Sequence, residues 1–148
     1  MFEFIGLFIF ISGFIIGLGA VTVIDLHGLL GRRSSYWTEA TIRTHKVTKP
    51  LIWTGMFLAV LGGIIFYTQN PVNWITAIHA TMIPILLANG LYLSLHISPI
   101  LIEREKDGRA RELLDEKMQR SISLSFIISF IGWWGSLGLL IHYILHYA

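Results

Sequence analysis

The fold of this protein is predicted from one apolar stretch, Asn73 to Ile100, which reads NWITAIHATMIPILLANGLYLSLHISPI and contains two histidines and an asparagine. About 20 apolar residues are enough for a helix to cross the hydrocarbon core of a bilayer. Polar side chains within such a span usually face a bundle interior or a cavity rather than lipid. We therefore expect His79, Asn89 and His96 to place this helix at the centre of any functional site.

The spacing of the polar residues predicts where they lie on this helix. Met82, Asn89 and His96 recur every seven residues and share one stripe, whereas His79 lies away from it. The two histidines are separated by roughly 25 Å along a straight helix, which is most of the hydrocarbon thickness. We expect one histidine near each membrane face, with Pro84 between them as the place for a kink.

Three further apolar segments predict an all-α integral membrane four-helix bundle. Hydrophobic residues make up 54% of the 148 residues, and the mean hydropathy is +0.67. We expect a single transmembrane domain over residues 1–148 with antiparallel up-down topology, its spans at approximately residues 3–25, 48–68, 74–98 and 121–146. Small residues four apart, at Gly13 with Gly17 and at Gly55 with Ala59, favour close helix packing and a homo-oligomer.

Composition excludes several classes of function. The chain has no cysteine, so disulfides, thiolate metal sites, iron-sulfur clusters and covalently attached haem are not expected. The net charge is +2, but the basic residues flank the spans instead of forming a soluble patch, so no nucleic acid is expected as a partner. No Walker loop, nucleophile elbow or dinucleotide fingerprint occurs, which argues against a nucleotide cofactor.

The distribution of charge predicts the orientation in the membrane. All 11 Lys and Arg residues lie in the first and third polar segments. By the positive-inside rule we expect cytoplasmic loops at residues 28–47 and 101–120 and both termini on the non-cytoplasmic side. In the third segment Glu105 with Arg109, and Asp107 with Arg111, are four apart, as is a further pair, Glu116 with Arg120. This spacing predicts a solvated helix that prolongs the spans, with Gly108 weakening its first part.

With this topology the histidines form two tiers, and the outer tier holds His79, His142 and His146. His142 and His146 are four apart on one helix, a spacing that presents both imidazoles to a common ion, and His79 lies at a similar depth. Two alternatives follow. A b-type haem would be ligated by His79 and His142 from two facing helices, or a metal ion would be held by His79, His142 and His146.

The inner tier contains two further candidates for cofactor binding, His96 and His45. His96 is the stronger candidate, because His45 directly precedes Lys46 and fits a solvated interface. Asp25 at this depth is expected to pair with His45, His96 or an arginine of the first loop. For Asn89 we favour a hydrogen bond between helices over a ligand role.

Three motifs carry a resemblance to a known family. They are GLGAVTVID at Gly17 to Asp25, IWTGMFLAVLGGIIFY at Ile52 to Tyr67, and ILLANGLYLSLHISP at Ile85 to Pro99. Together they resemble a poorly characterised group of small bacterial four-helix membrane proteins, similar in layout to the copper-resistance protein D family and to the four-helix, haem-associated protoporphyrinogen oxidase. The resemblance implies metal or haem handling in a bacterial inner membrane, with His79 as a haem ligand and Asp25 and Asn89 as shared pattern positions.

The sequence therefore predicts a small membrane protein that binds haem b or a histidine-ligated metal ion and works in membrane redox chemistry or electron transfer. It would act as a haem-dependent oxidoreductase or an electron-transfer subunit, with the lipid bilayer and further copies or a larger membrane complex as partners. One alternative is a cofactor-free interaction or assembly protein. Another is a small ion or metal permease, which we favour less because the middle of the bilayer holds no ionisable bridge between the tiers.

Overall fold

Helices make up most of residues 1–147, which are the residues that the computed structural model describes. The helical elements are α1 (Phe2–Gly31), α2 (Ser35–Tyr67), α3 (Trp74–Tyr92), η1 (Leu93–Ile97), α4 (Ser98–Lys106) and α5 (Glu116–His146). Within the described residues four helical segments are long and apolar enough to cross a membrane, and the third of them is the continuous run of α3, η1 and α4. The predicted all-α bundle with four helices of spanning length is confirmed.

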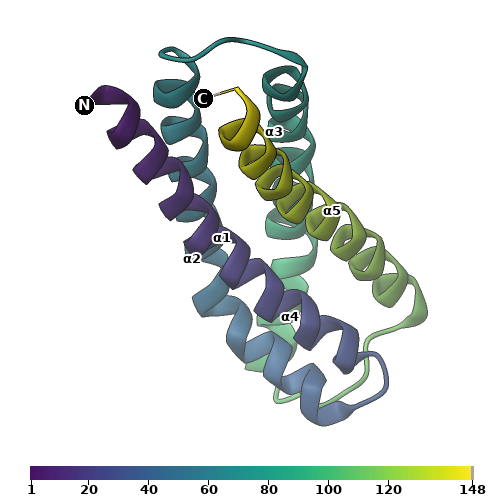
Figure 1. Ribbon diagram of the computed structural model, residues 1–148. Helices are drawn as coiled ribbons and strands as arrows, with labels where there is room; N and C mark the ends of the chain where they lie inside the picture. The colour runs from purple at the N-terminus through teal and green to yellow at the C-terminus, as the bar shows by residue number, and fades with distance from the viewer. Residues whose placement is uncertain (148) are drawn as a thin grey trace.

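The first two helices form a close pair, visible as the purple and blue ribbons in Figure 1. Glycines allow this approach, because a side chain at Gly13 would overlap the backbone of Ala59 and one at Gly55 would overlap the backbone of Gly17. Small residues bring membrane helices together by letting their backbones touch. The glycine motifs that predicted self-association are thus used for packing within the chain.

The second pair consists of α3 and α5, which are joined by hydrogen bonds of Asn89. Its Nδ2 donates to the Ser125 carbonyl and to Ser129 Oγ, both at 3.2 Å, and Ser125 Oγ donates to Asn89 Oδ1 at 2.8 Å. α5 also touches α1, where Trp133 packs on Gly17. We call the boundary between the α1–α2 pair and the α3–α5 pair the seam, and it contains the cavities described below.

Both chain ends lie at the same end of the bundle as the α2–α3 turn, and the charged connections lie at the opposite end, which we call the charged end (Figure 1). The expected loop at residues 28–47 is mostly helical, because α1 continues to Gly31 and α2 already begins at Ser35. Ser34 caps α2 by accepting a hydrogen bond from the Trp37 N–H, and Thr38 Oγ1 donates to the Gly31 carbonyl at 2.8 Å. These polar contacts support helix outside the apolar segments.

The solvated helix expected in the third polar segment is present at its two ends and interrupted between them. α4 ends at Lys106 and Gly108 adopts a φ of +72°, a left-handed conformation that glycine tolerates best. α5 begins only at Glu116, where Asp115 accepts a hydrogen bond from the Met118 N–H at 2.8 Å. The helical spacing of the charges is thus overridden by a turn at Gly108.

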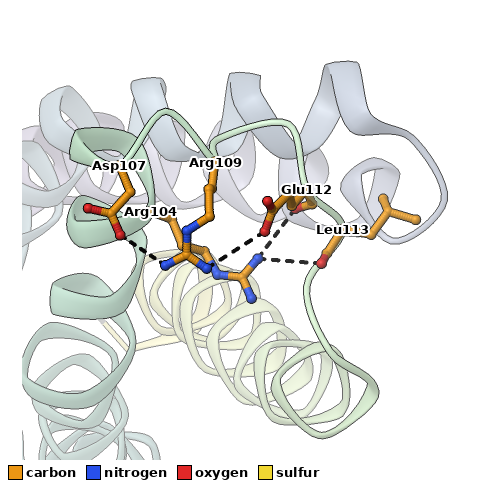
Figure 2. A network of polar contacts seen from close by, with 5 residues as sticks. All are labelled: Arg104, Asp107, Arg109, Glu112 and Leu113. Carbon is orange, nitrogen blue, oxygen red and sulfur yellow. Dashed lines mark hydrogen bonds and ion pairs between the residues drawn. The ribbon is translucent and has the colours of Figure 1, made fainter.

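The turn at Gly108 changes which charged side chains form ion pairs (Figure 2). Arg109 pairs with Asp107 at 2.9 Å and with Glu112 at 3.7 Å, while Arg104 donates to the carbonyls of Glu112 and Leu113, each at 3.4 Å. Of the three pairs predicted at helical spacing, the structure forms the one between Glu116 and Arg120, at 2.6 Å.

Two further ion pairs tie this connection to α2. Glu105 pairs with Lys46 and Arg111 pairs with Glu39, each at 2.7 Å. The hydrogen bond to the Glu39 carboxylate raises the pKa of the Arg111 guanidinium. The charged end is therefore held by contacts between distant segments rather than along one helix.

Candidate functional site

A cavity of about 100 Å³ lies in the seam near the charged end, and we call it the polar cavity after the polar side chains that stand in its mostly apolar lining. Its polar lining residues come from α1, α2, η1 and α5 and are Asp25, Thr41, His45, Lys49, Trp53, Ser94, Ser123 and Ser125. Asp25 Oδ2 and His45 Nε2 are buried and have no hydrogen-bond partner among residues 1–147. Buried polar atoms without a partner are costly, so water or a ligand in the cavity would stabilise them.

The π-helical turn η1 forms one wall of the polar cavity. Pro99 lacks an N–H and its ring crowds the carbonyl four residues earlier, which accounts for the wider turn just before it. Lys49 Nζ donates to the Ser94 carbonyl at 3.5 Å and to Ser98 Oγ at 3.3 Å, and Trp53 Nε1 donates to Ser94 Oγ at 3.2 Å. The irregular turn thus brings a lysine and a tryptophan of α2 to the cavity.

A middle cavity of about 50 Å³ continues along the seam from the polar cavity. Asp25 and Trp53 line both of these cavities. The middle cavity in turn shares Met56, Leu86 and Trp133 with an apolar cavity of about 220 Å³. The three cavities therefore follow one another, with Asp25 at the first junction and apolar side chains at the second.

His79 lines the apolar cavity together with Tyr67. The Tyr67 oxygen lies 2.6 Å from His79 Nδ1, and His79 Nε2 lies 2.9 Å from the Ser136 carbonyl oxygen. A carbonyl only accepts, so Nε2 is the donor, and in a neutral imidazole Nδ1 then accepts from the Tyr67 hydroxyl. Both ring nitrogens of His79 are used by protein atoms.

The other two histidines of the outer tier lie elsewhere. His142 and His146 are exposed near the end of α5, with ring centroids 4.2 Å apart. His142 also packs against Trp74, at 6.3 Å between centroids, and His146 Nδ1 lies 2.9 Å from the His142 carbonyl. Neither lines the apolar cavity beside His79. The structure thus does not bring the three histidines together.

The described residues do not fit the haem or metal sites that the histidine pattern predicts. Coordination of iron by His79 would require the loss of one of its two hydrogen bonds, and His142 lies outside the cavity that His79 lines. The apolar cavity, of about 220 Å³, is also smaller than the roughly 300–1,000 Å³ that is usual for drug-sized ligands, and haem is at least as large as these. In residues 1–147 no group of three or more His, Cys, Asp or Glu is placed to hold a metal ion. Haem or metal binding stays a prediction from the sequence.

The inner-tier histidines are separated in the same way. His45 lines the polar cavity with Asp25, whereas His96 is exposed and stacks on Tyr92 at 5.2 Å. The i→i+5 bonding of η1 takes about one residue more than an α-helical turn, so it rotates His96 off the stripe that it was expected to share with Asn89. Of the two histidines expected to pair with Asp25, His45 lines the polar cavity together with Asp25 and His96 does not.

Four site residues escaped the sequence reasoning: Lys49, Trp53, Tyr67 and Ser94. Lys49 counted only as a basic residue of a loop, and an aromatic residue at the end of a span is ordinarily an interfacial anchor. Their hydrogen-bond partners depend on how two helices are rotated toward each other, and the residue periodicity of one helix does not determine this rotation. The one available signal was the Ser-Pro pair at Ser98, which marks an irregular helix turn.

No family model, no curated protein and no solved structure matches this chain. The resemblance to small bacterial four-helix membrane proteins therefore stays a prediction from its motifs. What the protein does has to be inferred from the chemistry of the residues along the seam.

Proposed function

We propose that this protein is a small permease in which Asp25 binds a transported proton inside a membrane-embedded helical bundle. The observation that carries this proposal is that the Asp25 carboxylate lines both the polar and the middle cavity, with Oδ2 buried and unpaired among the described residues. Ionisable side chains inside membrane domains are costly and characteristically mark ion or proton pathways.

The chemistry of the polar cavity favours a proton over a metal cation. The cavity offers a single carboxylate, from Asp25, and places the ammonium of Lys49 in the same lining. Hard divalent cations require about six oxygen ligands, and a nearby positive charge opposes their binding. A cavity of about 100 Å³ with several polar side chains in its mostly apolar lining has room for a few water molecules, which would connect Asp25 to His45.

The rest of the seam supplies the remainder of the pathway. The middle cavity extends from Asp25 to an apolar layer of Met56, Leu86 and Trp133, which separates it from the hydrogen-bonded groups of His79 and Tyr67. Transporters commonly use interrupted helices and the rocking of one helix group against another to open such a barrier. Here the irregular point of the third helix is the π-helical turn η1, and the α3–α5 pair would move against the α1–α2 pair.

In this proposal the charged end faces the cytoplasm and both termini face outward, across a bacterial inner membrane. The basis is the distribution of Lys and Arg, which lie in the first and third polar segments and not in the α2–α3 turn. The polar cavity then opens toward the cytoplasmic side, and the apolar cavity lies toward the outer side.

The test is proton flux into liposomes that contain the purified protein and a trapped pH dye, driven by a potassium diffusion potential. We expect the wild type to carry protons, and Asp25→Asn to reduce the flux to the rate of protein-free liposomes, because an amide cannot take up the proton. Asp107→Asn makes the same change at an exposed turn and should retain the wild-type rate.

Two results would contradict the proposal: a wild-type flux no greater than that of empty liposomes, or an unchanged flux in Asp25→Asn. A Soret band in the purified protein that disappears in His79→Ala would instead support the haem prediction.

A further inference from the structure

We infer that the apolar cavity is a second binding site, which takes a lipid-soluble aromatic ring bearing a hydroxyl group, as in a phenol or a hydroquinone. This site is separate from Asp25, which does not line the apolar cavity. The inference therefore does not depend on proton transport.

The size and the lining of the apolar cavity suit one aromatic ring. Its volume is about 220 Å³, and an apolar cavity of roughly 150 Å³ already stays dry and binds benzene. Phe10, Phe14 and Trp133 line it, and the rings of Phe14 and Trp133 meet edge to face at 6.0 Å. Aromatic rings favour such edge-to-face contacts, so a further ring would add to this set.

The polar pair in the lining selects for a hydroxyl group on that ring. His79 Nε2 donates to the Ser136 carbonyl, so Nδ1 of a neutral His79 accepts a hydrogen bond from the Tyr67 hydroxyl. The Tyr67 hydroxyl thus already donates its one proton to His79, but its oxygen can still accept a hydrogen bond. A ligand hydroxyl can donate to this oxygen, whereas a ligand carbonyl, which only accepts, cannot bind it.

The position of the opening indicates that the ligand enters from the lipid. Ile64 on α2 is 59% exposed and Ala80 on α3 is exposed, and both line the cavity. They lie within helices that are apolar enough to cross a membrane. The cavity thus reaches the surface between α2 and α3, where the bilayer would surround the protein.

Fluorine NMR titrations of the full chain in lipid nanodiscs test this site, with para-fluorophenol and para-fluorotoluene as probes of nearly equal size. The phenol should bind about 3- to 10-fold more tightly than the toluene, as expected for one net hydrogen bond. Ala80→Trp at the exposed rim should weaken both probes by about tenfold or more by filling the opening. Ala88→Trp, at an exposed position of α3 outside the lining, is the matched control and should bind like the wild type.

A second variant tests the selectivity. Tyr67→Phe alone would uncover Nδ1 of His79 as a new acceptor, so the double variant Tyr67→Phe with His79→Leu is used, and it should bind the two probes equally. Asp25→Asn should leave both affinities unchanged, because Asp25 does not line the apolar cavity, so failure of this site and failure of proton transport are distinguishable. Equal affinity of the two probes in the wild type would overturn the inference, and so would binding that Ala80→Trp does not weaken.

Discussion

Asn89 is the polar side chain that joins α3 to α5. It makes three hydrogen bonds, with both atoms of its amide in use, to Ser125 and Ser129. In lipid the hydrophobic effect does not drive helices together, so packing and such hydrogen bonds hold the pair. This arrangement explains a half-buried amide in the third helix without a ligand. The next residue, Gly90, lines the polar and the middle cavity, so Asn89 lies beside the seam.

We expect Asn89→Leu to lower the free energy of unfolding by about 1–2 kcal/mol, because hydrogen bonds between membrane helices contribute about 0.6–2 kcal/mol each and the partners on α5 would lose theirs. Unfolding by denaturing detergent in bicelles measures this change. Gln69→Leu, at an exposed position in the α2–α3 turn, is the control. A loss as small for Asn89→Leu as for the control would show that the amide does not hold the helices together.

Among the helices, the α1–α2 pair depends most directly on glycine. Gly13, Gly55 and Gly62 each face backbone of the partner helix so closely that an added Cβ would overlap it. Gly19 lies on the same helix as Gly13 but is exposed, and an added Cβ there meets no atom of the described residues within 4 Å. One helix therefore contains both a glycine that packing requires and one that it does not.

This contrast predicts opposite effects for the same substitution. Gly13→Ala should destabilise the protein by about 1–3 kcal/mol, because the methyl group forces α1 and α2 apart. Gly19→Ala should leave stability unchanged or raise it by up to about 1 kcal/mol, since alanine restricts the unfolded chain and favours helix. Thermal unfolding in detergent compares the two variants. Equal effects would mean that α1 and α2 are not in the close contact described here.

For the whole molecule, the arrangement of the two helix pairs places the polar, middle and apolar cavities in the seam. The polar cavity lies toward the charged end and the apolar cavity toward the end where the α2–α3 turn and the chain ends lie. Asp25 and His79 therefore face different environments although both belong to the boundary between the same pairs. The proposed proton pathway depends on the two ends facing opposite sides of the membrane.

The absence of cysteine makes this orientation testable by single-cysteine labelling. In bacterial spheroplasts, Gln69→Cys in the α2–α3 turn should react with a membrane-impermeant maleimide. Glu112→Cys, at the charged end, should react only after the membrane is permeabilised, because the positive-inside rule places that end in the cytoplasm. The reverse labelling pattern would invert the proposed orientation, and labelling of both positions in intact spheroplasts would rule out a spanning bundle.

The sequence by itself determined the all-α class and the four helices of spanning length, because the length and apolarity of a segment are local properties that decide whether it can cross a bilayer as a helix. It also singled out Asp25 and Asn89, because polar side chains within membrane-spanning segments are costly and usually pair with other groups. In the third polar segment the sequence indicated Gly108 as a weak point of the helix, but not that a left-handed turn there separates charges at helical spacing.

Only the tertiary structure decided which polar groups meet. The contact of Tyr67 with His79, and that of Lys49 with Ser94, depend on how helices are rotated about their axes and how closely glycines let them approach. His96 leaves the expected stripe because η1 changes the helical phase, and His142 ends up at the surface although its spacing suited a ligand. Such pairings follow from the packing of all the helices at once, which the periodicity of any one segment does not contain.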